Sequence, residues 1–549
     1  MSSNACAVHR AVRELLGRLI SGARNPPGVI LVLEHALAIY VVHKTAGYVA
    51  SVGLRGALRD AAGVLVRSVK ALPGARGLVE QEKRETLAKI EEFVVGNDEE
   101  PEELRLHELP GRGWGRDRIF ARFEELKKHE EHFVEGRAFG GVYHPLHDEL
   151  HKVQCDAYVA FSDTNALYPA IFRGVRKFEA ELVSMAVRLL HGGEDACGSL
   201  TSGGTESILC MVKAYRDHAL RTRGIRRPEF IVPVTAHAAI DKACEYFGVK
   251  LVHVPVTQDQ RVDVDAVRRA LNQNTIAIYA SAPTFPHGVI DPIERLGEVA
   301  RAAGVGLHVD NCMGGFICSF LEREGLLHAG FDFRVPGVTS ISMDLHKYGL
   351  CQKGASVVCY STRELRRHQY CTVTDWPGGM YCTATMQGSR NGGIIATTWA
   401  TLAFNGCERY AVMARKVHSV WQRLRDTIPT IPCLELVGEP DACIIAFTAK
   451  GCNIYEVADV MERKGWALPR LQYPPAVHVC VSERMEPLVE EWISDLREAV
   501  ALCRDSPEQV KDGMAGIYGS AAIIPDRSLV GELLEGYLDS LYLVSKERR

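Results

Sequence analysis

Residues 305–360 read VGLHVDNCMGGFICSFLEREGLLHAGFDFRVPGVTSISMDLHKYGLCQKGASVVCY. The stretch contains three short apolar runs with β-branched residues, at 305–310, 340–344 and 355–360. Similar runs precede them at 230–234, 251–256 and 275–281, and helix-like segments lie between several of the six. Strands that alternate with helices indicate a mostly parallel sheet. The stretch therefore predicts a large α/β domain.

The pattern changes after about residue 403, where strands become fewer and helices longer. We predict a smaller C-terminal α/β domain over 404–549 and place the large domain at 166–403. Residues 97–108 read NDEEPEELRLHE, an acidic, proline-containing stretch that predicts a linker. It closes an N-terminal helical extension over 1–110, and an N-terminal arm over 111–165 follows it.

The extension contains an apolar segment, VILVLEHALAIYVV, at 29–42. A membrane-spanning helix needs about 20 predominantly apolar residues. An extension to residue 52 supplies this length but adds His43 and Lys44, and the segment already holds Glu34 and His35. A membrane anchor over about 29–52 and an amphipathic or buried helix both stay open. The excess of basic residues after the segment would keep the following domain in the cytosol.

Composition limits the classes of function. The chain has 549 residues, of which 64 are basic and 68 acidic, for a net charge of -4. A nucleic-acid binder shows a basic excess or a basic face, so we expect no nucleic-acid partner. The 17 cysteines include no C-x-x-C pair, which indicates reduced thiols in a reducing compartment. We expect no metal ion in the site.

A candidate phosphate site lies at the helix start TSGGTESI, residues 201–208. Small residues such as Gly203, Gly204 and Thr205 leave backbone N–H groups free to face an anion, and the helix dipole adds to this attraction. An ordinary Ser/Thr-capped helix start is the alternative.

Two further candidates follow strands. His237 stands at a strand-to-helix junction, where ligands gather in open α/β sheets, and its ring can stack on a planar ligand. A helix-capping or core histidine is the alternative. Asp310 ends the run at 305–310, and an acid at the end of a buried strand is costly unless it is paired. Its alternative role is to cap the next turn.

The last candidates are His346 and Lys347, which follow the run at 340–344. A lysine in a dry pocket has a lowered pKa, which makes its amine a better nucleophile toward an aldehyde. A surface lysine is the alternative for Lys347 alone. Together, a phosphate site, a stacking histidine, an acid and a lysine are what pyridoxal 5'-phosphate (PLP) needs. We expect Asp310 to pair with its pyridine nitrogen and Lys347 to hold it as a Schiff base.

The order of these parts resembles the PLP-dependent group II decarboxylase superfamily and, within it, the sphingosine-1-phosphate lyases. The resemblance runs from about residue 135 to 542 and is dense in SLTSGGTESI, FPHGVIDPI, LHVDNCMGGF, FDFRVPGVTSIS and TDWPGGMY. Simple decarboxylases do not share FDFRVPGVTSIS or TDWPGG, so the lyases match better. The implied fold is the aspartate-aminotransferase-like fold, fold type I.

The resemblance implies further site residues. His346 would pack near the cofactor, Asn165 would lie beside it, and Ser389 of the GSRNGG loop would contribute from the partner subunit. Tyr143 and Lys353 resemble residues that line the substrate side, where each would bind the substrate phosphate or move a proton. Tyr168 replaces a histidine of the family; it can still donate a hydrogen bond to a phosphate but cannot carry a positive charge at neutral pH.

The implied activity is retro-aldol cleavage of phosphorylated sphingoid bases to a long-chain aldehyde and phosphoethanolamine. A PLP-dependent amino-acid decarboxylase of the glutamate decarboxylase kind and a non-enzymatic membrane-associated scaffold are the alternatives. The resemblance also implies a homodimer with shared active sites. It places the chain in the endoplasmic reticulum membrane by a single span, with the catalytic domain facing the cytosol.

Overall fold

The structure, a computed structural model, describes residues 73–95, 105–128, 136–143, 148–505 and 527–544. The predicted anchor at 29–52 and most of the predicted linker lie outside the described residues. Among the helices that are described, none has the length and the hydropathy of a membrane span. The chain forms two units, of which one holds the residues up to Arg116 together with those from Ser520 on, and the other holds Asp117–Gly519.

The first unit contains α3 (Pro73–Val95) and α17 (Arg527–Ser540), which pack on each other. Gly536 of α17 permits the close approach, because a Cβ there would lie 2.2 Å from a methyl group of Leu87. An ion pair between Lys83 and Glu532 also joins the two helices. Within the predicted extension, residues 73–95 are therefore helical, and the C-terminal helix α17 packs with them in the same unit.

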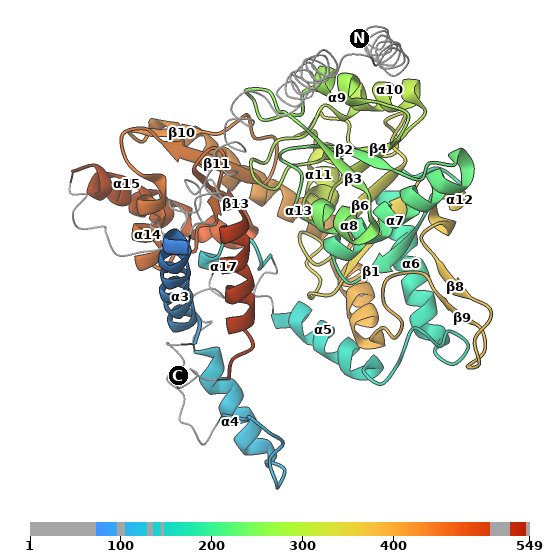
Figure 1. Ribbon diagram of the computed structural model, residues 1–549. Helices are drawn as coiled ribbons and strands as arrows, with labels where there is room; N and C mark the ends of the chain where they lie inside the picture. The colour runs from blue at the N-terminus through green and yellow to red at the C-terminus, as the bar shows by residue number, and fades with distance from the viewer. Residues whose placement is uncertain (1–72, 96–104, 129–135, 144–147, 506–526, 545–549) are drawn as a thin grey trace, which may run out of the picture. The chain divides into compact units, whose positions relative to one another are not determined.

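A seven-stranded sheet is the centre of the second unit (Figure 1). Its strands are β1 (Cys197–Thr201), β2 (Glu229–Pro233), β3 (Lys250–Val254), β4 (Thr275–Ser281), β5 (Gly306–Asp310), β6 (Ser340–Asp344) and β7 (Ser356–Tyr360). Their order is β1-β7-β6-β5-β4-β2-β3, and only β7 runs against the others. All six predicted runs are strands within one or two residues, and the mostly parallel sheet is confirmed. The sequence did not predict β1.

Helices cover both faces of this sheet, so its strands are apolar on both sides. In β2, Phe230 and Val232 pack in one hydrophobic cluster, whereas Ile231 between them packs in another. This burial explains the near-continuous apolar runs, which are typical of parallel sheets. The covering helices are α6 (Arg173–Leu189), α7 (Gly204–Arg223), α8 (Ala239–Phe247), α9 (Val264–Ala270), α10 (Ile293–Ala303), α11 (Gly314–Arg323) and α12 (Arg363–Arg367).

Residues with known capping preferences stand at both ends of these helices. Gly224, Gly248 and Gly304 each follow a helix with a positive φ of 62–66°, the left-handed conformation that glycine adopts without steric cost. Asp263 begins α9 because its carboxylate accepts hydrogen bonds from two backbone N–H groups of the first turn.

The C-terminal part of the second unit forms a four-stranded antiparallel sheet in the order β10-β11-β13-β12. Its elements are β10 (Leu434–Leu436), β11 (Ile444–Ala449), β12 (Arg470–Leu471), β13 (Ala476–Cys480), α14 (Ile454–Arg463) and α15 (Val489–Asp505). The long helix α13 (Gly392–Thr427) leads into it and is interrupted at Gly406, which has φ 58°. The predicted domain boundary at 403 falls inside α13 and stays a prediction.

Three peripheral elements complete the second unit. They are α4 (Arg116–Lys127), α5 (Asp148–Phe161) and a hairpin of β8 (Cys371–Val373) and β9 (Tyr381–Thr383). Helix α5 packs along α13.

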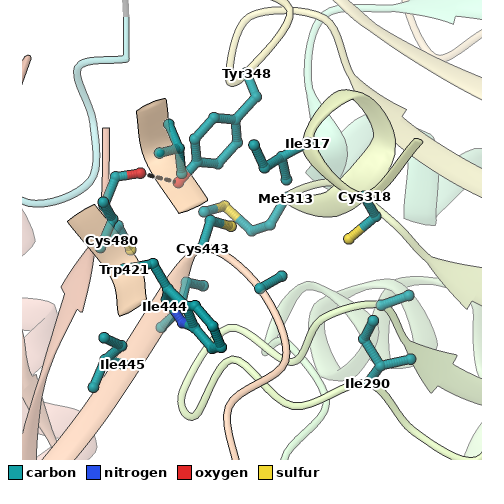
Figure 2. Close-up of a cluster of buried hydrophobic side chains, with 14 of the residues drawn as sticks. Ile290, Met313, Ile317, Cys318, Tyr348, Trp421, Cys443, Ile444, Ile445 and Cys480 are labelled. Carbon is teal, nitrogen blue, oxygen red and sulfur yellow. Dashed lines mark hydrogen bonds between the residues drawn. The ribbon is translucent and has the colours of Figure 1, made fainter. Parts of the chain in front are cut away.

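One hydrophobic core joins the two sheets of the second unit. Met313 and Ile317, at the start of α11, point toward Cys443 and Ile444 of the smaller sheet (Figure 2). The hydroxyl of Tyr348 donates a hydrogen bond to the backbone carbonyl of Val481 at 2.6 Å. The residue after the predicted catalytic lysine is therefore held by the smaller domain.

Candidate active site

The predicted cofactor residues meet at one edge of the large sheet. Strands β1, β2, β5 and β6 run in the same direction, and each of these residues follows the carboxyl end of one of them. Asp310 is the last residue of β5, and Lys347 follows β6 by three positions. Gly203 follows β1, and His237 follows β2. Ligands of open α/β sheets bind at this edge.

Asp310 is buried and held as a carboxylate. Its Oδ1 accepts hydrogen bonds from the backbone N–H of Cys312 at 3.0 Å and from the Ser342 hydroxyl at 3.1 Å, and its Oδ2 accepts one from the Tyr279 hydroxyl. Burial alone would raise the pKa of Asp310. A hydrogen bond from the Cys312 side chain, the charge of the nearby His237 and the Tyr279 hydroxyl outweigh it and lower the pKa to about 2. A buried anion of this kind suits the protonated nitrogen of a pyridine ring.

The start of α7 offers a narrow cradle for an anion. The first four N–H groups of a helix have no partner within the helix, and no side chain caps this one. A Cβ added at Gly204 would lie 2.8 Å from Cys312 Sγ and 3.0 Å from both carboxylate oxygens of Asp344. Only glycine fits there, which leaves the backbone N–H groups accessible to a phosphate.

Glu206 fixes this helix start to a distant segment. Its carboxylate accepts hydrogen bonds from the backbone N–H and the hydroxyl of Ser202, both at 2.7 Å. It also accepts from the backbone N–H of Met386 at 3.0 Å and from the amide of Gln387 at 3.2 Å. The loop that leads to Ser389 is thereby attached to the cradle.

Lys347 forms an ion pair that the sequence analysis did not predict. Its Nζ lies 2.8 Å from Oδ2 of Asp344, a carboxylate whose side chain is 2% exposed. Burial favours the neutral amine, but the charge of Asp344 outweighs it and raises the pKa of Lys347 above its usual value. The expectation of a lowered pKa is therefore wrong for the chain without a cofactor, because burial was considered without this partner.

The two histidines of the site differ in their surroundings. The Nδ1 of His346 accepts a hydrogen bond from the backbone N–H of Ala355 at 3.2 Å, and burial lowers the pKa of His346 to about 4, so the ring is neutral. His237 is exposed; its Nδ1 accepts a hydrogen bond from the backbone N–H of Ala239 at 3.1 Å, and its ring meets the edge of Phe285. One face of the His237 ring can therefore meet a planar ligand.

Lys353 and Tyr143 lie together beside these residues. The Nζ of Lys353 lies 5.1 Å from the centroid of the Tyr143 ring and donates a hydrogen bond to the backbone carbonyl of His346 at 3.3 Å. Burial and the charge of Lys347 lower the pKa of Lys353. Burial raises the pKa of Tyr143 well above its usual value. Lys353 therefore releases its proton more easily than an ordinary lysine, and Tyr143 stays neutral.

Two of the remaining predicted residues, Asn165 and Ser389, are hydrogen-bonded to each other. Asn165 donates a hydrogen bond to the Ser389 hydroxyl at 2.9 Å, and its Oδ1 accepts one from the backbone N–H of Arg390 at 3.1 Å. The structure thus brings Asn165 and Ser389 together, although they are 224 positions apart. Tyr168, in contrast, is 53% exposed. Whether these residues contribute to a partner's site stays a prediction.

Sequence reasoning missed Asp344, Tyr279 and Glu206. Asp344 ends β6 as Asp310 ends β5, so the same pattern of an acid at a strand end marks it. Tyr279 carries no such signal, because only the pairing of β4 with β5 brings it to Asp310.

The residues at this edge fit PLP. The ionised carboxylate of Asp310 suits the pyridine nitrogen, and the helix start at Gly204 suits the phosphate. The flat ring of His237 suits the face of the cofactor ring, and the amine of Lys347 suits the aldehyde. These matches rest on the contacts of Asp310, Gly204 and Lys347 in the structure. They do not rest on the order of the motifs along the sequence.

Comparisons with known proteins identify the family. Residues 175–450 match the pyridoxal-dependent decarboxylase conserved domain. A sphingosine-1-phosphate lyase of Arabidopsis thaliana is 39% identical over 94% of this chain and 95% of its own length. Sphingosine-1-phosphate lyase 1 of Mus musculus is 41% identical over 79% of this chain and 77% of its own length.

Solved structures show the same fold. A sphingosine-1-phosphate lyase of Burkholderia pseudomallei has a TM-score of 0.71 and 39% identity, and the match covers 74% of this chain and 94% of that one. A glutamate decarboxylase of Lactobacillus brevis has a TM-score of 0.63 at 20% identity over 73% of this chain and 96% of its own, which indicates a common fold only. The chain therefore belongs to the sphingosine-1-phosphate lyase family of proteins with a pyridoxal-dependent decarboxylase domain.

Proposed function

We propose that this chain is a PLP-dependent carbon–carbon lyase that cleaves phosphorylated sphingoid bases to a long-chain aldehyde and phosphoethanolamine. The observation that carries the proposal is the arrangement of Asp310, Lys347 and Gly204 at one sheet edge, in a chain 39% identical to a sphingosine-1-phosphate lyase over 94% of its length. When bound, PLP supplies an electron sink for the electron pair of the broken bond.

The residues of the chain perform the other tasks. With PLP bound, the carboxylate of Asp310 would hold its ring nitrogen protonated, and His237 would pack against the ring. The substrate 3-hydroxyl must lose its proton while the bond between C2 and C3 breaks, and C2 must then gain a proton. Burial and the charge of Lys347 lower the pKa of Lys353, which favours its amine as the base for the hydroxyl proton. The neutral Tyr143 hydroxyl, beside it, donates a hydrogen bond and orients the substrate.

A product assay tests the proposal. The holoenzyme is mixed with a phosphorylated sphingoid base, and aldehyde, phosphoethanolamine and CO2 are measured. We expect equal amounts of the first two and no CO2, and we expect Lys347→Ala to lose the absorbance of the bound cofactor and all turnover. Release of CO2 from glutamate with the lipid left intact would instead identify an amino-acid decarboxylase. A protein that stays colourless with added PLP would support the scaffold alternative.

We also propose a homodimer with shared active sites. The support is the exposed apolar surface of the segment between β8 and α13, where Trp376 is 53% exposed and Met380 88% exposed. Glu206 fixes the end of this segment, which includes Ser389, at the cradle. Sedimentation equilibrium tests the proposal, together with a mixture of inactive Lys347→Ala and Ser389→Ala chains. Recovery of activity in the mixture is the expected result, and a fully active monomer would refute it.

The proposed location is the endoplasmic reticulum membrane, with one span near 29–52 and the catalytic domain in the cytosol. The support is the apolar segment at 29–42 with basic residues after it, and a lipid substrate gives the enzyme a reason to be held at a membrane. Carbonate extraction of membranes from cells that express the full chain is the test. Release of the protein by carbonate would exclude an integral anchor.

A further inference from the structure

Two histidines and a glutamate gather on the outer side of the large domain, outside the site described above. His218 lies on α7, 14 residues after Gly204, which corresponds to about 20 Å along the helix axis. Glu364 lies on α12, and His368 caps the end of that helix four positions later. Residues four apart on a helix share a face, so α12 presents Glu364 and His368 together. Helices α7 and α12 pack on each other (Figure 1).

The ligand atoms of the three side chains lie close enough together to share one ion. One ligand atom of each lies within 4.8 Å of the ligand atoms of the other two. The ring centroids of His218 and His368 are 5.2 Å apart, and the ring planes are inclined by 74°. Two imidazoles that bind one tetrahedral Zn²⁺ at about 2.0–2.1 Å place their ring centroids roughly 5 Å apart. The two rings therefore already stand at the separation that a shared ion requires.

His368 supplies an independent observation. Its Nδ1 is shielded from water and has no hydrogen-bond partner among the residues that the structure describes. A shielded ring nitrogen without a partner is costly, and coordination of a metal is one of the ways in which histidine nitrogens are satisfied.

Charges of both signs lie around the site. The carboxylate of Asp217 is paired with Lys213 at 3.0 Å, and Arg221 adds a positive charge near His368. Glu364 supplies the negative charge. The Nζ of Lys213 donates a hydrogen bond to the backbone carbonyl of His368 at 2.9 Å, which fixes the end of α12.

A second group with similar composition provides a comparison. The ligand atoms of His191, Glu322 and Asp332 also lie within 4.8 Å of one another. The guanidinium of Arg334 already occupies this group, with Nη2 at 2.5 Å from Glu322 and 2.7 Å from Asp332. A cation bound there would have to displace an arginine, whereas the group on α7 and α12 contains no such cation.

We propose that His218, Glu364 and His368 bind one divalent transition-metal ion of the zinc class. Three protein ligands from imidazole and carboxylate leave a fourth position for water. The ion fastens α12 to α7. Gln369 follows His368 directly and accepts a hydrogen bond from the Tyr360 hydroxyl at 2.8 Å, so the ion stabilises the beginning of the segment that ends at Ser389.

The test is a count of bound Zn²⁺ in the holoenzyme after equilibrium dialysis, measured by atomic emission. We expect His218→Ala and His368→Ala each to hold one Zn²⁺ per chain fewer than the unaltered protein. Glu364→Gln, at an exposed position, should weaken this ion's binding by at least about tenfold. His191→Ala is the matched control and should bind as the unaltered protein does.

A second measurement separates metal binding from misfolding. Zn²⁺ should raise the thermal unfolding midpoint of the unaltered protein and of His191→Ala, raise that of Glu364→Gln less at the same Zn²⁺ concentration, and leave that of His368→Ala unchanged, while the absorbance of bound PLP stays the same in all four. Equal Zn²⁺ content in His218→Ala, His368→Ala and the unaltered protein would overturn the proposal, and so would an equal rise of the midpoint in every variant.

Discussion

Asp344 holds Lys347 in the form that cannot react with an aldehyde. Attack on the cofactor requires the neutral amine, whereas the carboxylate 2.8 Å from Nζ favours the ammonium. At this distance and an effective dielectric constant of about 20, the attraction amounts to about 6 kcal/mol. This energy corresponds to roughly four orders of magnitude in the equilibrium between ammonium and amine.

The substitution Asp344→Asn therefore should accelerate the covalent capture of PLP by the cofactor-free protein. The amide keeps a hydrogen bond to Nζ, and part of the Lys347 side chain reaches solvent, so we expect a fraction of the full effect. At pH 7 the second-order rate constant should rise by at least about tenfold, because more of the lysine is neutral.

Stopped-flow absorbance of PLP binding between pH 6 and pH 9 measures this rate. In the unaltered protein the rate should climb across the whole range, since the raised pKa of Lys347 keeps the amine scarce. In Asp344→Asn it should level off within the range, and Asp344→Glu, which keeps the charge, should behave like the unaltered protein. Identical rates and pH profiles in the amide variant would refute the role of the carboxylate.

Three further predictions concern the same edge of the sheet. Gly204→Ala should weaken PLP binding by at least about tenfold in a fluorescence titration, because the added Cβ would lie 2.8 Å from Cys312 Sγ. Gly193→Ala is the control and should bind PLP as the unaltered protein does, because nothing lies within 4 Å of its added Cβ. Equal losses of PLP affinity in both variants would contradict the role of the helix start at Gly204. Tyr279→Phe should raise the pKa of Asp310. The pKa of this carboxyl is lowered to about 2 in the folded chain, so it contributes roughly 2–3 kcal/mol to the free energy of unfolding above pH 4, and this contribution is lost as the pH falls toward 2. Urea unfolding at pH 3–5 should therefore show a lower free energy of unfolding for the variant. An unchanged free energy of unfolding would show that the hydrogen bond is unimportant. Lys353→Met should lower kcat by about 100-fold or more and leave the absorbance of bound PLP unchanged; a loss confined to KM would assign Lys353 to binding instead of proton transfer.

Local patterns predicted the strand ends well. Asp310 and Lys347 follow apolar runs that the sheet buries on both faces, and such runs are visible in the sequence without any knowledge of the fold. β1 was missed because CGSLT combines a glycine and a serine with one β-branched residue, a weak strand signal. Its place beside β7 depends on pairing with residues more than 150 positions away.

Contacts between distant segments explain the remaining differences. The pairing of Asn165 with Ser389 and of Tyr279 with Asp310 depends on tertiary structure and leaves no local trace. The pKa of Lys347 shows a different limit. The direction in which the pKa moves depends on the side chain of Asp344, which ends β6 three residues earlier.

The core shared by the two sheets restricts how a long-chain lipid enters the site. Met313, Tyr348, Trp421 and Ile444 belong to one buried cluster, to which both domains contribute. A hinge that opened the domains like jaws would expose such side chains to water at about 1.5–3 kcal/mol each. It would also carry Lys347 away from Asp310, since Tyr348 is bonded to Val481. The shared core therefore makes an opening between the two sheets costly.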